Sequence, residues 1–384
     1  MVYLKEIPEW FWSPHVWLPK GYTWDDFVSN EKISFPHWAD LWTYPFIMAF
    51  IGIGLRCLIL NKFVFGPIAT YCGLKDIKVR PVIPIESLEA LYKKYKIHPP
   101  KEATLAHAKK LDWSERMVER WLRQRFAMTK VSKHTKFMEC AWQFLYYLSI
   151  FIYGVFIMLK KPWLYDVNKC WYDYPHHNLD NDVWWYYMIS LSFYWSMVFT
   201  HFFETKRKDF WQMFFHHLVT IALITFSWTC NFTRVGTLIL VLHDCADIPL
   251  QAAKMCIYVG HKAVCDAVFA LFAVTWVLTR DCIYPLWIVR STLFEATNII
   301  PLFPAYYIFN SLLIILFLLH LYWTYFIFRI IGNTVIKGKV EDDRSSTDED
   351  LAISDSELND KENGDINGLR KLHSCPSIDK NIRS

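Results

Sequence analysis

The chain of 384 residues is 54% hydrophobic and 18% aromatic, with 19 Trp, 21 Tyr and 29 Phe. Soluble domains rarely carry so many aromatic residues, whereas membrane proteins place Trp and Tyr at the two membrane interfaces. The formal net charge of +4 is unevenly distributed, because basic segments lie in the middle of the chain and an acidic segment at its end. Composition therefore excludes an ordinary soluble domain and predicts a membrane protein.

Apolar runs separated by polar segments predict an all-α polytopic fold. Residues 1–40 are rich in Trp and Pro and indicate an interfacial segment. The first run, 41–60, predicts a transmembrane helix over 41–61, in which Arg56 lies near enough to one end to reach water. Runs able to cross about 30 Å of hydrocarbon recur at 142–159, 183–203, 210–230, 235–258, 263–289 and 304–331, which makes seven predicted spans.

The basic segments set the expected orientation. Residues 62–136, the triplet Lys206, Arg207 and Lys208, and residues 337–339 fall on one side of the membrane if all seven spans are real. The positive-inside rule makes that side cytosolic, so we expect a luminal N-terminus and a cytosolic C-terminus.

Residues 340–384 are acidic and polar, which predicts a disordered cytosolic tail. Four hydroxyl residues in this tail have an acidic residue three positions further on: Ser345, Ser346, Thr347 and Ser354. Acidophilic kinases favour that pattern, so phosphorylation is one expectation and an unmodified solubilising tail is the alternative.

The ten cysteines contain no CxxC pair and no spacing typical of a metal site. Most lie in apolar runs, so we expect buried free thiols rather than a disulfide framework or a zinc site. Residues 1–20 have no continuous apolar core, so no cleavable signal peptide is expected.

Five ionisable side chains lie inside two consecutive predicted spans: His216, His217, His243, Asp244 and Asp247. Ionisable residues are costly in hydrocarbon, so their presence in a span indicates function by default. The pattern predicts an intramembrane active site. The alternative is that each histidine is a hydrogen-bonded packing residue.

Spacing suggests how these side chains are arranged. Asp247 follows His243 by four residues and Asp244 by three, so we expect all three on one helix face, with a carboxylate orienting an imidazole. Arg280 is a cation that can pair with Asp244 or Asp247. No HExxH spacing occurs, so no metal is expected.

Three other histidines are expected to play no part. His176 and His177 follow Tyr174-Pro175 in a predicted luminal loop and are interpreted as solvated, and His320 in the last span as structural.

KRKDFWQMFFHHLVT and the following LHDCADIPLQAAKM resemble the Lag motif of ceramide synthases. Further matches are FWSPHVWLP near the start, KPWLYDVNKCWYDYP before the third span and WWYYMISLSFYWS within it. The resemblance covers residues 8–345 and implies a TLC domain over 132–333 with six of the spans.

The resemblance implies acyl transfer from acyl-CoA to the amine of a sphingoid base in the endoplasmic reticulum membrane. It associates activity with His216, His217, His243, Asp244 and Asp247, with Arg280 as a weaker carry-over. Acyl-CoA is a substrate, and no cofactor is implied. Lys206, Arg207 and Lys208 are placed to meet CoA phosphates, and they serve membrane topology equally well. Membrane lipids and a homo- or hetero-dimeric partner are further expectations.

Two mechanisms stay open at this point. An imidazole can act as the base that deprotonates the acceptor amine. Alternatively, it attacks the thioester and forms an acyl-imidazole that the amine then resolves, with His216 as the nucleophile. We favour the second, because the two substrates differ greatly in solubility. The family also links a luminal loop, here 291–301, to acyl-chain preference, which the sequence does not translate into a chain length.

Residues 68–132 occupy the position of the truncated homeobox-like region of animal ceramide synthases, with VERWLRQR at 118–125 as the matching core. A DNA-reading homeodomain has Asn in place of Gln124 and usually Arg in place of Phe126. We therefore expect a folded cytosolic juxtamembrane module, with Ser114 as the N-cap of a basic amphipathic helix. DNA binding is the less favoured alternative.

Two rival functions remain. A non-catalytic lipid sensor of the same fold would keep a cavity without needing both His216 and His217. A membrane-tethered transcriptional regulator would need an intact base-reading helix and a location in the nuclear envelope.

Overall fold

The computed structural model describes residues 10–31, 33–75, 81–129, 131–204 and 209–337. The described residues form helices and turns and contain no β-strand, which confirms the predicted all-α class. The chain divides into two compact units, Ile77–Ser132 and the combination of Met1–Asp76 with Lys133–Arg344. The predicted tail phosphorylation sites and the basic triplet 206–208 lie outside the described residues.

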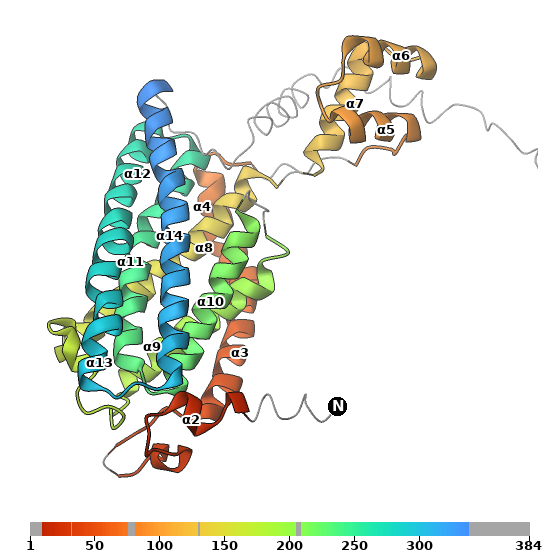
Figure 1. Cartoon of the computed structure of the whole chain (residues 1–384). Coiled ribbons are helices and arrows are strands. Elements are labelled where there is room, and N and C mark those ends of the chain that lie inside the picture. The colour runs from red at the N-terminus through yellow and green to blue at the C-terminus, as the bar shows by residue number, and fades with distance from the viewer. Residues whose placement is uncertain (1–9, 32, 76–80, 130, 205–208, 338–384) are drawn as a thin grey trace, which may run out of the picture. The chain divides into compact units, whose positions relative to one another are not determined.

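The first membrane helix is longer than the predicted 41–61. α3 (Trp38–Gly54), the π-helical η2 (Leu55–Phe65) and α4 (Gly66–Tyr71) form one continuous helix of 34 residues (Figure 1). Arg56 does not extend towards water as predicted. It is 8% exposed, and its Nη1 lies 2.5 Å from Glu204 Oε1, because a paired guanidinium in hydrocarbon is less costly than an unpaired one.

The middle of the larger unit contains four long helices. They are α8 (Lys133–Met158), α9 (Asn181–Thr200), α10 (Phe210–Thr229) and α11 (Thr233–Val259). α11 packs against α8, α9 and α10, and α9 also packs against α3 (Figure 1). The polar residues of α11 therefore lie inside the bundle.

The last helices differ from the sequence interpretation. α12 (Lys262–Trp276) continues through η5 (Val277–Val289), η6 (Ser291–Glu295) and α13 (Ala296–Ile299) as one helix of 38 residues. The predicted luminal loop 291–301 is thus wrong for most of its length, and only a short turn precedes α14 (Pro304–Lys337). Ser291 is fully buried and accepts a hydrogen bond from Trp171 Nε1 at 2.9 Å, which stabilises the helical extension.

Six helices of the described residues are long and apolar enough to cross a membrane. They correspond to six of the seven predicted spans. The remaining span coincides with α9, a helix of 20 residues that is rich in Trp, Tyr and Ser and largely buried among its neighbours. The multi-pass membrane architecture is therefore confirmed, and the number seven stays a prediction.

Two glycines allow the close approach of α9 to its neighbours. A Cβ on Gly236 of α11 would lie 1.7 Å from the Tyr187 hydroxyl oxygen. A Cβ on Gly154 of α8 would lie 2.9 Å from the Tyr186 ring. Both tyrosines are at most 1% exposed, so the helices could not separate without opening the core.

One end of the bundle is covered by the N-terminal segment and the connection between α8 and α9. α2 (Pro14–Trp17) packs on α14, and the fully buried Trp17 accepts a hydrogen bond from Cys230 Sγ at its carbonyl oxygen. The connection contains η3 (Pro162–Leu164) and η4 (Val167–Cys170), both short helical turns. This end also contains η1 (Trp24–Phe27).

His177 was predicted to be solvated, and this is wrong. It is fully buried, and its Nε2 donates to the Tyr172 carbonyl oxygen at 2.8 Å. Burial, together with the charge of Arg234, lowers the pKa of His177 to about 4. Asn231, the acceptor of a formal glycosylation sequon, is also fully buried and donates to the carbonyl oxygens of Pro175 and His177.

The smaller unit is built from α5 (Glu86–Tyr95), α6 (Lys101–Leu111) and α7 (Glu115–Ala127). Ser114 caps α7 by accepting a hydrogen bond from the Met117 amide, as predicted. Trp121 is buried and donates to the Ile83 carbonyl oxygen. Arg125 lies 2.6 Å from Glu89, and this ion pair raises the pKa of the guanidinium. The unit does not include 68–71, which lie in α4.

Candidate active site

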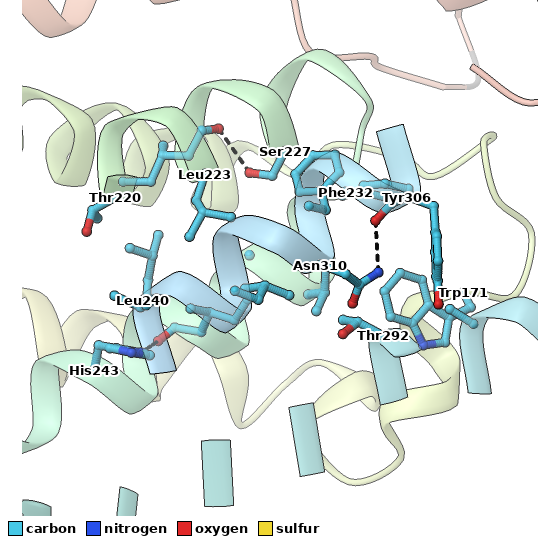
Figure 2. Close-up of a pocket in the computed structure, with 18 of the residues that line it drawn as sticks. Trp171, Thr220, Leu223, Ser227, Phe232, Leu240, His243, Thr292, Tyr306 and Asn310 are labelled. Atoms are coloured by element: carbon cyan, nitrogen blue, oxygen red, sulfur yellow. Dashed lines mark hydrogen bonds between the residues drawn. The ribbon is translucent and has the colours of Figure 1, made fainter. Parts of the chain in front are cut away.

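A largely apolar cavity, called cavity A, extends from the centre of the larger unit towards the end covered by α2. It contains about 1020 Å³ of empty space and is lined mainly by aliphatic and aromatic residues from α10, α11, α14 and the turn before α14, with Arg280 from η5 and Thr292 from η6. Figure 2 shows His243 and Thr220 at one end of this cavity and Trp171 and Tyr306 at the other. Asn310 Nδ2 donates to the Tyr306 carbonyl oxygen at 2.9 Å, whereas its Oδ1 is buried and has no hydrogen-bond partner among the described residues.

A second cavity, cavity B, lies towards the opposite end of the bundle, where α9 ends and α10 begins. It contains about 1140 Å³ of empty space. Its lining includes aromatic and aliphatic side chains. It also includes four acidic and two basic residues: Glu139, Glu204, Asp209, Asp247, Lys254 and Arg280. Cavity B is therefore far more polar than cavity A.

Three of the predicted site residues line both cavities: His216, Asp247 and Arg280. His216 comes from α10, Asp247 from α11 and Arg280 from η5. The His216 ring meets the Trp323 ring edge-to-face at 5.4 Å, and its Nδ1 has no hydrogen-bond partner in the described part of the chain. The junction of an apolar and a polar cavity is therefore formed by an imidazole, a carboxylate and a guanidinium.

Arg280 holds this junction together. Its Nη2 donates to Asp247 Oδ2 at 3.1 Å and to the His243 carbonyl oxygen at 2.6 Å, while Nη1 donates to His320 Nε2 at 3.3 Å. Its guanidinium also stacks over the Trp276 ring at 4.8 Å. Of the two predicted partners of Arg280, Asp247 is thus the correct one. Arg280 lies in a π-helical segment, a geometry common at functional sites.

His243 lines cavity A beside His320. Its Nδ1 donates to the Ile239 carbonyl oxygen at 2.6 Å, so the neutral ring has its lone pair on Nε2. That Nε2 has no partner among the described residues. The His243 and His320 rings lie 4.9 Å apart, and both contact the Tyr284 ring. Since this ring is oriented by the Ile239 carbonyl oxygen and not by a carboxylate, the prediction that Asp247 orients His243 is wrong.

His217 faces a different direction from His216. It is 3% exposed, lines cavity B alone and lies near the rings of Tyr194 and His201. Successive residues on a helix point about 100° apart, which explains the separation. Both imidazoles nevertheless line cavity B, because His216 lines both cavities.

Asp244 does not share the face of His243 and Asp247, which corrects the spacing argument. Its Oδ2 accepts a hydrogen bond from Tyr186 of α9 at 3.0 Å, and the residue lines neither cavity. Although Asp244 is one turn from Asp247, it is about 100° away from His243. It serves α9–α11 packing rather than the junction.

Sequence reasoning missed His320. It is fully buried, contacts Arg280 and His243, and comes from α14. The signal was present, because an ionisable residue inside a span is itself an indication of function. Among the described residues, no group of three or more His, Cys, Asp or Glu side chains is arranged to hold a metal ion.

Comparison with known proteins identifies the family. The TLC domain family model matches residues 136–329. Ceramide synthase 5 of Mus musculus is 38% identical over 342 residues, which cover 88% of this chain and 82% of the relative. Ceramide synthase 3 of Homo sapiens is 38% identical over 343 residues, covering 89% and 88%. Ceramide synthase hyl-1 of Caenorhabditis elegans is 40% identical over 241 residues, covering 59% and 65%.

The matched TLC domain coincides with the helices that surround the two cavities, and the relatives extend the match into the preceding segments. Since the similarity covers most of both chains, this protein belongs to the ceramide synthase family.

Proposed function

We propose that this chain transfers the acyl group of an acyl-CoA to the amine of a sphingoid base, forming ceramide or dihydroceramide. The names of the relatives support this activity. The observation that carries the proposal is the meeting of an apolar and a polar cavity at His216, Asp247 and Arg280. An acyl chain fits cavity A, and polar groups of the reactants fit cavity B.

The thioester carbon of the acyl-CoA then lies at the junction beside His216. In the route that we favour, the neutral imidazole attacks this carbon, the C–S bond breaks, and CoA leaves as the thiolate. The amine attacks the resulting acyl-imidazole, the C–N bond to histidine breaks, and the amine proton passes to the released imidazole. In the direct route, His216 takes the amine proton while the amine attacks the thioester.

Arg280 supports either route by holding Asp247 and His320 in fixed positions. Its guanidinium also lies where negative charge develops on the carbonyl oxygen, which is the role of a preorganised cation in acyl transfer. His243, with its bare Nε2, is a second base for the proton released by the amine.

The first experiment incubates membranes containing the protein with long-chain acyl-CoA and no base, and measures the intact mass of the protein. An added acyl mass that is present in the wild type and absent in His216→Ala establishes the acyl-imidazole route. His217→Ala is expected to keep the adduct, because His217 does not line cavity A. His176→Ala, an exposed histidine outside both cavities, is the matched control.

The other outcomes are distinct. If no adduct forms beforehand but an amide forms once the sphingoid base is added, the result supports direct transfer, with histidine as the proton acceptor. If folded protein forms no adduct and no amide, the enzymatic function is rejected and a lipid sensor is favoured.

We also propose a location in the endoplasmic reticulum membrane with a luminal N-terminus and a cytosolic C-terminus. Cavity B then lies towards the cytosol, where CoA is supplied, and Lys206, Arg207 and Lys208 precede the helix that carries His216. Protease protection of tags at the two termini in sealed microsomes tests this orientation. Dimerisation and lipid contact of the 77–132 unit remain proposals of the same kind.

A further inference from the structure

Gln251 is a buried amide in the wall of cavity B that no contact explains. It lies on α11 and is 4% exposed. Its Oε1 has no hydrogen-bond partner among the described residues. Leaving a buried amide unsatisfied costs about 1–3 kcal/mol, so such a group in a cavity wall indicates that a ligand completes its hydrogen bonding.

The position of Gln251 relates it to the junction. It follows Asp247 by one helical turn on α11, at a rise of about 6 Å. Asp247 lines both cavities, whereas Gln251 lines cavity B alone. A molecule whose reactive atom is at the junction therefore brings its neighbouring atoms, a few bonds away, to the Gln251 amide.

The surroundings select the kind of ligand. Acidic side chains in the lining of cavity B outnumber basic ones by four to two, and they still outnumber the cations once Arg56, the partner of Glu204, is counted. The lining also includes apolar residues, among them Leu250 and Phe272. An amphiphile with a cationic head and several hydrogen-bond donors suits this wall better than a polyanionic phosphate does.

We propose that Gln251 hydrogen-bonds the polar head of the sphingoid base, at a hydroxyl next to the reacting amine, and so positions the acceptor for attack. This inference rests on the acyl transfer proposed above. The amine meets the acyl carbon at His216, and the adjoining hydroxyl donates to Gln251 Oε1. Gln251 is thus a specificity-determining residue for the acceptor and not for the acyl donor.

The test compares steady-state kinetics of the full-length wild type and Gln251→Met in membranes. Methionine has nearly the same length and removes the amide. The KM for sphinganine is expected to rise about tenfold, the effect of one hydrogen bond, while the KM for acyl-CoA stays unchanged. Gln251→Glu, which restores an acceptor and adds a negative charge, is expected to restore the wild-type KM for the base or lower it.

A substrate change provides a second measurement. Sphinganine is compared with two analogues. One lacks the terminal hydroxyl, and the other lacks the hydroxyl on the other side of the amine. The wild type is expected to discriminate against the analogue that lacks the hydroxyl bound by Gln251. Gln251→Met is expected to lose that discrimination and keep the other, which a purely structural role of Gln251 would not produce.

Gln212→Met is the matched control, because Gln212 lies on α10 outside both cavities. Thermal unfolding of each variant verifies that it is folded. A raised KM for acyl-CoA with an unchanged KM for the base would overturn the inference and assign cavity B to CoA. Unchanged values for both substrates would also overturn it. Failure of the wild type to form any amide would instead reject the acyl transfer itself.

Discussion

Arg280 Nη2 lies 3.1 Å from Asp247 Oδ2, although 33 residues separate the two in the chain. The same nitrogen donates to the carbonyl oxygen of His243, so one guanidinium joins η5 to two positions on α11. Both side chains are at least four-fifths buried, at 3% and 19% exposed. This pair therefore couples the stability of the bundle to the geometry of the junction.

Removing one member of the pair is expected to destabilise the protein. Arg280→Leu leaves a buried carboxylate, and Asp247→Leu leaves a buried guanidinium, at a cost of about 3 kcal/mol each. The double variant is expected to lose less than the sum, because neither charge is left unpaired. Thermal unfolding in detergent measures all three. Strict additivity would show that the two residues do not interact.

The contact between α9 and α11 gives a second prediction. Gly236→Ala places a Cβ 1.7 Å from the Tyr187 hydroxyl, so the helices must shift, at a cost of about 1–3 kcal/mol. Gly332→Ala is the control, because no atom lies within 4 Å of its Cβ position on α14. Adding Tyr187→Phe to Gly236→Ala is expected to recover part of the loss. Equal melting temperatures for the two glycine variants would contradict this packing.

His177 predicts a pH dependence of stability. Its pKa falls from 6.5 in the unfolded chain to about 4 in the buried site, so between these values the unfolded state binds more protons. Stability therefore falls as the pH drops below about 6.5 and continues to fall to about 4, with a loss of about 2 kcal/mol between pH 7.5 and 5.

The measurement is the melting temperature across this range, for the wild type and His177→Gln. The variant is expected to have a flatter profile whatever its absolute stability. His176→Gln changes the exposed neighbouring histidine and is expected to keep the wild-type slope. A variant at position 177 with the full wild-type slope would show that another group is responsible.

The sequence was sufficient to predict the all-α membrane fold and the three residues of the junction. Intramembrane charge identified His216, Asp247 and Arg280, because such residues are tolerated in hydrocarbon only when paired or lining a cavity. The prediction from spacing was wrong for Asp244, because residues three and four apart cover a broad sector of a helix. In that sector Asp247 points to the cavities, whereas Asp244 points to Tyr186.

Other features depend on long-range packing that local patterns do not contain. His320 was interpreted as structural, yet α14 brings it to Arg280, 40 residues away in the chain. The segment 291–301 was interpreted as a loop from the family resemblance, but most of it is helical, and Trp171 hydrogen-bonds Ser291 inside the protein. The two cavities, which share part of their lining, likewise arise from the packing of helices that lie far apart in the chain, and no local motif encodes them.

Cavity A gives the last prediction, which concerns the acyl donor. Leu223 of α10 is 8% exposed and lines the middle of the apolar wall, between Thr220 and Ser227 (Figure 2). Leu223→Trp fills part of the space beyond His216. The enzyme is therefore expected to favour shorter acyl-CoAs, and its activity with the longest chains is expected to fall about tenfold, since overfilling the space that a chain occupies costs about 1–3 kcal/mol.

The competition is measured with an equimolar series of saturated acyl-CoAs, and the ceramide products are quantified by mass spectrometry. Leu218→Trp is the matched control, because Leu218 lies on the same helix, is 40% exposed and lines neither cavity. This variant is expected to keep the wild-type product profile. If Leu223→Trp lowers activity equally for all chain lengths, the acyl chain does not lie in cavity A. A change in the depth of the cavity alters chain-length preference only when the chain occupies that cavity.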